Sequence, residues 1–524
     1  MSTTANEATE QQSPASAEPI RAGTVVIGSG FSGLGMGIAL LKQGRTDFVI
    51  LEKAHAVGGT WRDNTYPGAA CDVPTHLYSY SFEPRTDWSR LWSYQPEIFD
   101  YLREVATKYG LDRYLQFGKA AFRGYWDETE MRWHLWTTDG QEYIAQFVVS
   151  AIGALHIPSI PEFAGAEKFT GKAFHSAEWD HSVDLTGKRV AVIGTGASAI
   201  QFVPEIADKV ASLDLYQRTP AWVFPRRNMA IPDGVKRAFG SVPGLRRGFR
   251  NGLYWGAELG AYALNNRPIL LKGAEVVGKA FIKREIDDPE LQRKLTPDYR
   301  PGCKRLLGSS TYYSALNRPT SEVITEGIAA VTETGIVAAD GVHRPADVII
   351  YATGFHVTDS FESLSIIGRH GSDLVARFRA EGPTAHRGIT IADMPNVFFL
   401  LGPNTGLGHT SIVFMIESQI RYVTQLMRAV RDHGVDAIVP RSEVQEQYNR
   451  DVQRRLSTSV WNTGGCQSWY LDEHGNNRTL WPGYTWRYWL STRRLRESEY
   501  EFLSTSTHPG AGVRRSRGAA PASV

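Results

Sequence analysis

The chain has 524 residues, of which 42% are hydrophobic, so it is long enough to form two or three domains with substantial cores. Its 57 basic and 55 acidic residues nearly cancel, which argues against nucleic acid and against any strongly acidic partner. No uninterrupted apolar run reaches the length of a membrane span, so we expect no stable membrane insertion.

The two ends of the chain differ in composition from the rest. Residues 1–21 are rich in Ser, Thr, Ala, Glu and Gln and lack the apolar core of a signal peptide. Residues 505–524 are rich in Gly, Pro, Ala and Arg. Both segments are predicted to be disordered tails, and we expect the protein to be a monomer in the cytoplasm.

A glycine-rich turn follows the first predicted strand, at residues 24–27. Gly28, Gly30 and Gly33 form the pattern G-x-G-x-x-G. In such a turn the first glycine makes the tight bend, the second lets the backbone approach a pyrophosphate, and the third packs a helix on the strand. Glu52 lies 24 positions after Gly28, at the end of the next predicted strand, where a carboxylate accepts hydrogen bonds from ribose hydroxyls. This part of the chain is therefore predicted to bind FAD.

The same pattern recurs 166 residues later, after the predicted strand 189–193. Gly194 and Gly196 occupy the first two glycine positions, and Ala199 occupies the third. Arg218 lies 24 positions after Gly194, again at the end of a predicted strand. An arginine at this place attracts the 2′-phosphate of NADPH, which a carboxylate would repel. The second turn is therefore predicted to bind NADPH.

Strand-like runs alternate with helical stretches, as in doubly wound α/β folds. The runs 147–153 and 347–351 both end in small residues, where we expect the chain to pass from one nucleotide domain to the other. The predicted fold class is α/β, with two Rossmann-like dinucleotide-binding domains, the NADPH domain inserted in a discontinuous FAD domain, and a helical insertion. The predicted segments are the FAD domain at 22–153, the NADPH domain at 154–229, the helical insertion at 230–295, the NADPH domain again at 296–346 and the FAD domain again at 347–504.

Residues 230–295 interrupt the alternation of strands and helices. They mix basic residues such as Arg246 and Arg250 with aromatic ones such as Phe249 and Trp255. Two interpretations stay open. The insertion is either a helical subdomain that shapes a substrate entrance or an amphipathic surface that touches a membrane.

The three cysteines, Cys71, Cys303 and Cys466, lie far apart and form no C-x-x-C pair. This spacing favours a reducing compartment and argues against a redox-active disulfide. No metal site is predicted.

Three further segments carry the fingerprints of one enzyme family. Residues 169–180 match F-x-G-x-x-x-H-x-x-x-W-[P/D], and residues 58–72 match G-G-x-W-x-x-x-x-[F/Y]-P-G-x-x-x-D. Lys304 and Arg305 match a K-R pair. With these segments in the right order between about residues 22 and 490, the chain resembles the type I Baeyer–Villiger monooxygenases, a class B flavin-dependent family.

The resemblance implies an oxidoreductase that uses NADPH and O2 to convert ketones into esters or lactones through a C4a-peroxide of FAD. Arg305 would lie over the flavin and keep the peroxide anionic, since a fixed cation lowers its proton affinity. Asp72 would orient Arg305 through a bidentate pair. Lys304 and Thr219 would join Arg218 around the 2′-phosphate of NADPH.

Further cofactor contacts are implied by the same resemblance. Thr60, Trp61 and Tyr78 are expected beside the flavin, and Asn404 at its pyrimidine edge. Trp469 is expected near the nicotinamide, although packing within an aromatic cluster is an equally good interpretation of this residue. The remaining predicted cofactor-binding residues are Phe31, Ser32, Lys53, Gly59, Ala121, Thr195, Ala197, Ser198 and Gln201.

Three other functions compete with this interpretation. A flavin monooxygenase that oxygenates nitrogen or sulfur would share both glycine turns but not the 169–180 pattern. A disulfide reductase is disfavoured because no C-x-x-C is present, and a non-catalytic flavoprotein would need a broken Arg305 or Arg218. His175, inside the 169–180 pattern, is expected to couple the domains rather than to act as a general base.

Overall fold

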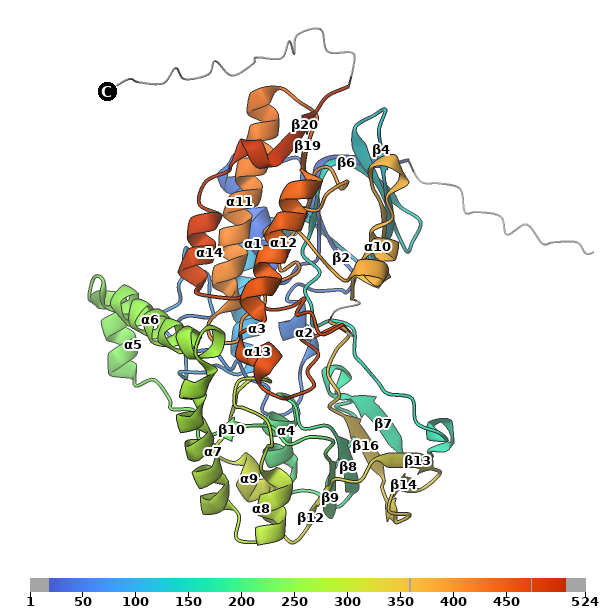
Figure 1. Ribbon diagram of the computed structural model, residues 1–524, viewed down its shortest axis with the longest axis vertical. Helices are drawn as coiled ribbons and strands as arrows, with labels where there is room; N and C mark the ends of the chain where they lie inside the picture. Colours follow the sequence, from blue (N-terminus) through green and yellow to red (C-terminus); the bar gives the residue numbers. More distant parts are fainter. Residues whose placement is uncertain (1–17, 358–359, 473, 506–524) are drawn as a thin grey trace, which may run out of the picture.

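The computed structural model describes residues 18–357, 360–472 and 474–505. The predicted tails therefore lie almost wholly outside the described residues. At the N-terminal end, however, the first strand already begins at Ile20, two residues before the predicted start of the FAD domain. Figure 1 shows the two sheets one above the other, with helices packed around each.

The first sheet has eight strands in the order β17-β4-β5-β6-β1-β2-β3, with β18 beside β6. The pairs β18–β6, β6–β1, β1–β2, β2–β3 and β17–β4 are parallel, whereas β4–β5 and β5–β6 are antiparallel, so the β4–β5 hairpin extends the sheet. The bounds are β1 Ile20–Ile27, β2 Phe48–Glu52, β3 Leu115–Phe117, β4 Ala121–Asp127, β5 Arg132–Thr137, β6 Glu142–Ser150, β17 Ser365–Ile367 and β18 Val397–Phe399.

The second sheet has five parallel strands in the order β12-β9-β8-β16-β7. β16 pairs with both β8 and β7, so the chain leaves the second sheet only after Tyr351. The predicted return to the FAD domain at residue 347 is therefore too early. The bounds are β7 Lys172–His175, β8 Arg189–Ile193, β9 Ser212–Tyr216, β12 Ser321–Ile324 and β16 Val348–Tyr351.

Both sheets are covered on both faces, as their nearly continuous apolar strands require. One face of the first sheet packs on α1, α3 and α11. The other face, which includes residues of the β4–β5 hairpin, packs on α10. The second sheet packs on α4, α7, α8 and α9 on one face and on β13 and β14 on the other. These helices and strands are α1 Phe31–Lys42, α3 Gln95–Lys108, α4 Ala199–Ile206, α9 Tyr312–Leu316, α10 Leu374–Glu381, α11 Ile412–His433, β13 Ile328–Thr332 and β14 Gly335–Ala338.

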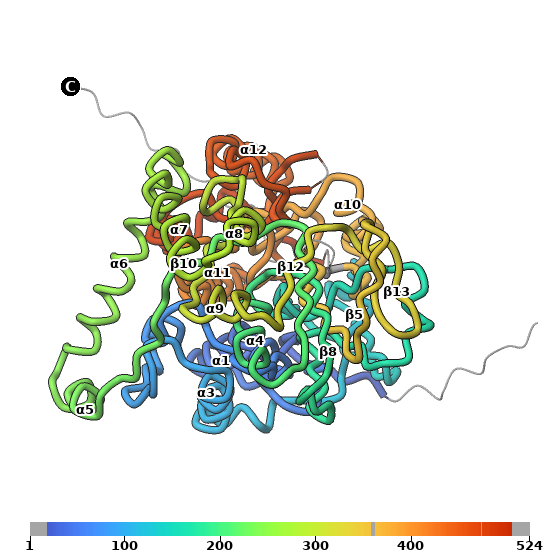
Figure 2. The backbone as a smooth tube through the Cα atoms, turned by 90° about the horizontal axis from the view of Figure 1, so that it is seen from below, coloured from blue at the N-terminus to red at the C-terminus, as the bar shows by residue number. Residues whose placement is uncertain are grey.

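The predicted insertion is helical, as expected. It comprises α5 Asp233–Ser241, α6 Leu245–Asn265, α7 Lys272–Glu285 and α8 Pro289–Leu295. Figures 1 and 2 show α5 and α6 projecting sideways from the rest of the molecule. The remaining elements are α2 Thr60–Asp63, α12 Ser442–Leu456, α13 Val460–Thr463, α14 Thr485–Ser491, β10 Val223–Phe224, β11 Leu307–Gly308, β15 His343–Pro345, β19 Ala437–Pro440 and β20 Tyr500–Leu503.

The first glycine turn depends on two glycines for different steric reasons. Gly28 has a φ of 104°, a region that L-residues with a side chain rarely adopt. A Cβ on Gly33 would lie 1.8 Å from the carbonyl oxygen of Gly28. The start of α1 therefore approaches the end of β1 so closely that only glycine fits at residue 33.

We predict that Gly33→Ala destabilises the fold by about 1–3 kcal/mol or more, because the added methyl forces the turn and the helix apart. Urea-induced unfolding measures the effect. The matched control is Gly240→Ala in α5, where an added Cβ meets nothing within 4 Å. Equal unfolding midpoints for Gly33→Ala and the wild type would contradict the steric argument.

Candidate active site

Arg305 and Asp72 form a bidentate ion pair between segments 233 residues apart. Arg305 Nη2 donates to Asp72 Oδ1 at 2.9 Å, and Arg305 Nε donates to Oδ2. The third donor, Nη1, bonds the carbonyl oxygen of Leu407 at 3.2 Å. Burial alone would raise the pKa of Asp72, but the charge and hydrogen bonds of Arg305 lower it, and Asp72 in turn raises the pKa of Arg305. Both groups are therefore ionised.

A second cation, Arg226, lies close enough to act on this pair. It lowers the pKa of Asp72, although less than Arg305 does, and its own pKa is lowered by burial. Tyr470 is buried beside Arg305. Neither residue was predicted from the sequence, because neither carries a recognisable motif of its own.

Glu52, at the end of β2, is engaged by the first glycine turn itself. Its Oε2 accepts hydrogen bonds from Ser29 N at 3.0 Å and Ser29 Oγ at 2.6 Å, and its Oε1 accepts one from Ala54 N at 3.0 Å. Arg62 Nη1 lies 3.0 Å from Oε1. Burial opposes ionisation, but these hydrogen bonds and Arg62 lower the pKa of Glu52. Each oxygen of the Glu52 carboxylate thus already has two partners. A ribose hydroxyl that binds Glu52 would therefore have to take the place of the Ser29 hydroxyl.

The predicted flavin neighbours surround the same turn. Trp61 Nε1 donates to Tyr78 OH at 3.0 Å. The Tyr78 ring meets Phe31, the first residue of α1, edge-on with 5.2 Å between centroids. Thr60 Oγ1 bonds the carbonyl oxygen of Leu155 at 3.4 Å, and Gly59 caps the short helix α2 with a φ of 51°. Ser32 is buried within α1.

The second glycine turn carries a cluster of positive charge. Gly194 has a φ of 109°, and Thr195 Oγ1 donates to the carbonyl oxygen of Thr219 at 2.9 Å. Lys304 Nζ donates to Thr219 Oγ1 at 2.6 Å. Burial and the nearby charge of Arg218 lower the pKa of Lys304. Two cations held together in this way favour an anion between them.

Gln201, on α4, connects the second glycine turn to the segment that carries Asp72. Its Oε1 accepts hydrogen bonds from Tyr66 OH at 3.0 Å and Ala70 N at 3.3 Å, and its Nε2 donates to Ala70 O at 3.0 Å. Ala197 and Ser198 immediately precede this helix. The amide of Gln201 thus joins α4 to the 66–70 loop. Its predicted contact to the cofactor stays a prediction.

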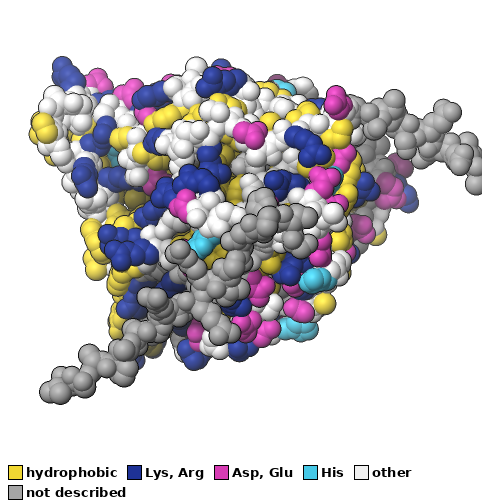
Figure 3. Space-filling model, turned by 90° about the horizontal axis from the view of Figure 1, so that it is seen from above, with side chains coloured by type: hydrophobic (Ala, Val, Ile, Leu, Met, Phe, Trp, Pro, Cys, Tyr) yellow, Lys and Arg dark blue, Asp and Glu magenta, His cyan; other side chains and the backbone are white. Residues whose placement is uncertain are grey.

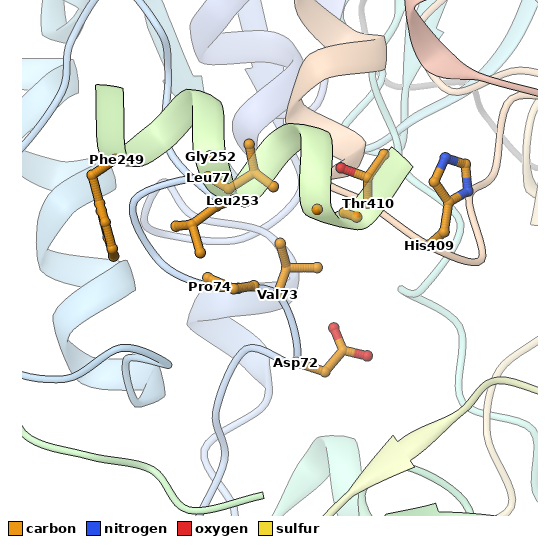
Figure 4. Close-up of a pocket in the computed structure, with 11 residues that line it drawn as sticks. Asp72, Val73, Pro74, Leu77, Phe249, Gly252, Leu253, His409 and Thr410 are labelled. Atoms are coloured by element: carbon orange, nitrogen blue, oxygen red, sulfur yellow. The ribbon is translucent and has the colours of Figure 1, made fainter. Parts of the chain in front are cut away.

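A cavity of about 540 Å³ lies beside Asp72. Figure 4 shows α6 along one side of the cavity, with Phe249 and Leu253 on it, and the loop that carries His409 and Thr410 at one end. The rest of the lining is mostly apolar and comes from residues 73–77 and 252–257.

The polar end of this cavity was not predicted from the sequence. Within the described part of the chain, His409 Nδ1 and Thr410 Oγ1 are buried without a hydrogen-bond partner. His409 Nε2 lies 3.4 Å from Glu258 Oε1 of α6. An apolar cavity with a few polar groups at one end suits a small organic molecule with a single polar function.

Comparisons with known proteins agree with this geometry. A family model described as pyridine nucleotide-disulphide oxidoreductase matches residues 25–232. A Baeyer–Villiger monooxygenase of Pseudomonas aeruginosa is 48% identical, with 94% of each chain covered. Another, from Streptomyces coelicolor, is also 48% identical and covers 91% of this chain and 92% of its own. The chain belongs to the Baeyer–Villiger monooxygenase family.

Solved structures support the same assignment. The cyclohexanone monooxygenase from Rhodococcus sp. Phi1, bound to NADP+, has a TM-score of 0.83 and 28% identity over 93% of this chain and all of its own. An oxidised steroid monooxygenase bound to NADP has a TM-score of 0.82 and 30% identity over 92% of this chain and all of its own. The predicted family, fold class, enzyme class and cofactors FAD and NADPH are confirmed, and oxygenation of nitrogen or sulfur is not favoured.

Four further predicted cofactor residues of this Baeyer–Villiger monooxygenase lie in other segments of the chain. Lys53 Nζ is 3.5 Å from His156 O, Ala121 begins β4, and Trp469 is 52% exposed. Asn404 is buried with a φ of 56°, and its amide bonds the carbonyl oxygens of Asn477 and Leu480. Their roles toward the cofactors stay predictions.

His175 lies in β7 and is buried. Its Nδ1 accepts a hydrogen bond from Ala177 N, and burial lowers the pKa of His175 to about 4. The imidazole is therefore neutral at physiological pH. Its backbone pairs with Tyr351 of β16, so the residue lies within the second sheet.

The prediction from cysteine spacing needs a correction. Cys303 and Cys466 form a disulfide across 163 residues, and Cys71 is the free, buried cysteine. Spacing missed this pair because only the folded chain brings the two loops together. The bond joins the loop of Lys304 and Arg305 to the loop of Trp469.

A cytoplasmic location and a monomeric state stay predictions. Among the described residues, no helix has the length and hydropathy of a membrane span.

We predict that the chain, unfolded without reductant, contains one titratable thiol, that of Cys71, and that reduction raises the number to three. A thiol reagent such as Ellman's measures both values. Cys466→Ser serves as the control, since it should expose a second thiol before reduction. Three thiols in the unreduced wild type would contradict the disulfide.

Proposed function

We propose that this Baeyer–Villiger monooxygenase oxidises a lipophilic ketone bound in the cavity beside Asp72, with Arg305 as the catalytic cation. The observation that supports this most is the Arg305–Asp72 pair, because it holds an ionised guanidinium next to an apolar cavity and between two nucleotide-binding turns. When bound, FAD reduced by NADPH would activate O2, of which one atom is inserted beside the carbonyl and the other leaves as water.

The second glycine of each turn is not crowded by other atoms. A Cβ on Gly30 would make only ordinary contacts, at 3.9 Å or more, and one on Gly196 would meet nothing within 4 Å. The second glycine is where a pyrophosphate approaches the backbone in such turns. We propose that FAD lies over Gly30 with its ribose toward Glu52, and that NADPH lies over Gly196 with its 2′-phosphate between Arg218 and Lys304.

Arg305 acts through its fixed charge. Oxygen insertion places negative charge on the attacking oxygen and on the carbonyl oxygen of the substrate, and a preorganised guanidinium stabilises that charge without reorganising. Asp72 is a positioning residue, because its bidentate contact fixes the plane of the guanidinium. Leu407 O holds a third donor of Arg305, so the loop before the cavity's polar end shares in this placement.

We predict that Arg305→Ala retains FAD but forms ester or lactone about 10²–10³-fold more slowly, the usual loss for one preorganised partner of a developing oxyanion. Asp72→Ala should reduce the same rate less, since Arg305 remains but is no longer oriented. Products from a panel of ketones with NADPH and O2 are quantified by gas chromatography, and released hydrogen peroxide is measured in parallel.

The matched control for Arg305→Ala is Arg227→Ala, which removes an exposed arginine from a neighbouring loop. We expect it to leave product formation unchanged. Near wild-type product formation by Arg305→Ala would show that another cation, such as Arg226, stabilises the reaction.

For the nucleotide site, we predict that Arg218→Ala raises the KM for NADPH about tenfold or more, since a hydrogen bond to a charged group contributes about 1.5 kcal/mol or more. The KM for NADH should change little, because NADH lacks the 2′-phosphate. Steady-state kinetics with both nucleotides measure this, with the exposed Lys209→Ala as a control. An equal rise for both nucleotides would contradict a contact to the phosphate.

A further inference from the structure

The projecting helices carry an exposed apolar surface. Of the 21 large hydrophobic residues exposed in the described chain, 12 lie between residues 229 and 277. Single exposed apolar side chains are ordinary, but a contiguous group of them marks an interaction site. We call this the α5–α7 surface, and its most exposed residues are Trp255, Leu259, Ile269, Leu270, Val276 and Val277, with Leu259 exposed by 80%.

The same surface is strongly basic. Residues 229–285, to the end of α7, contain ten Lys and Arg and four Asp and Glu, although the whole chain has 57 basic and 55 acidic residues. One of the four acidic residues, Glu258, is buried and accepts hydrogen bonds from Thr485 N. Arg247, Arg267 and Lys272 are exposed and form no ion pair with any described residue. On the left flank of Figure 3, basic and hydrophobic side chains lie side by side.

We propose that the α5–α7 surface docks on an anionic lipid bilayer. Apolar side chains that enter the boundary between headgroups and acyl chains, flanked by Lys and Arg that meet anionic lipids, are the chemistry of a peripheral membrane surface. Trp255 and Tyr262 suit this boundary, since their rings are partly apolar and partly polar. A second copy fits less well, because a two-fold contact would bring the same positive surface against itself.

The composition of α6 agrees with a helix that is stabilised by such a contact. Gly248, Gly252, Gly256 and Gly260 recur every four residues, and a Cβ on any of them would meet nothing within 4 Å. Glycine inside a helix weakens it, so α6 gains little from its own helical propensity. Burial of its apolar side in a bilayer would therefore protect its backbone amides from exchange.

The position of this surface also bears on the substrate. Phe249, one of the exposed residues of this surface, also lines the cavity beside Asp72, together with Leu253 and Ala257 on the side of α6 roughly opposite Trp255 and Leu259. If the proposed function is right, a lipophilic ketone dissolved in the bilayer would reach the cavity along this helix. Membrane binding itself does not depend on that function and is measured without turnover.

The test is sedimentation of the full-length FAD-loaded protein with vesicles of phosphatidylcholine alone or with phosphatidylglycerol. The wild type should sediment with the anionic vesicles at least tenfold more than with the neutral ones, and high salt should reduce this. The variant Trp255→Ser/Leu259→Ser should lose most of the binding, and Arg247→Gln/Lys272→Gln should lose the preference for anionic lipid. Hydrogen exchange should show α6 protected only when anionic vesicles are present.

The control is Phe117→Ser/Phe122→Ser, which removes two exposed aromatic residues outside the α5–α7 surface and should bind like the wild type. Circular dichroism and FAD content confirm that each variant is folded. Wild type that stays in the supernatant, or Trp255→Ser/Leu259→Ser that binds like wild type, would overturn the proposal. A dimer that this variant converts to a monomer, without vesicle binding, would overturn it in favour of a second copy.

Discussion

The ion pair of Arg305 with Asp72 is the contact on which the active site depends. It joins a segment that follows the helical insertion to one that follows the first glycine turn, and Leu407 O adds a third segment. Each group is the main opposite charge beside the other, so the pair stays closed in the wild-type protein. The pair therefore fixes the distance between the two nucleotide-binding units and orients the guanidinium at the same time.

Other contacts reinforce the same junction from different directions. Gln201 bonds the backbone of Ala70 from the second unit, only two residues from Asp72. The Cys303–Cys466 disulfide anchors the loop that carries Arg305 on its other side. The guanidinium is thus held by an ion pair, a carbonyl oxygen and a covalent bond two residues away. Such redundancy suits a group that must present its charge in one place while two large cofactors are bound.

The cavity is formed in a different way from the glycine turns. The glycine turns follow from local backbone geometry, whereas the cavity is enclosed by residues 72–77, α6 and the 409–410 loop, which are distant in sequence. Its lining is mostly apolar, and His409 and Thr410 provide polar atoms at one end. In the proposed function, specificity for the ketone therefore depends on segments that lie outside both glycine turns.

The sequence alone determined the family, the fold class, the two glycine turns and the opposite charges of Glu52 and Arg218. These are local signals, because steric limits on a turn and the charge at a strand end act over a few residues. Tertiary structure alone decided that β16 belongs to the second sheet, that Glu52 bonds Ser29, and that Gln201 joins α4 to the 66–70 loop. It also brought Cys303 to Cys466 and Arg226 toward Asp72. Such contacts depend on how distant segments pack, and no pattern along the chain records that.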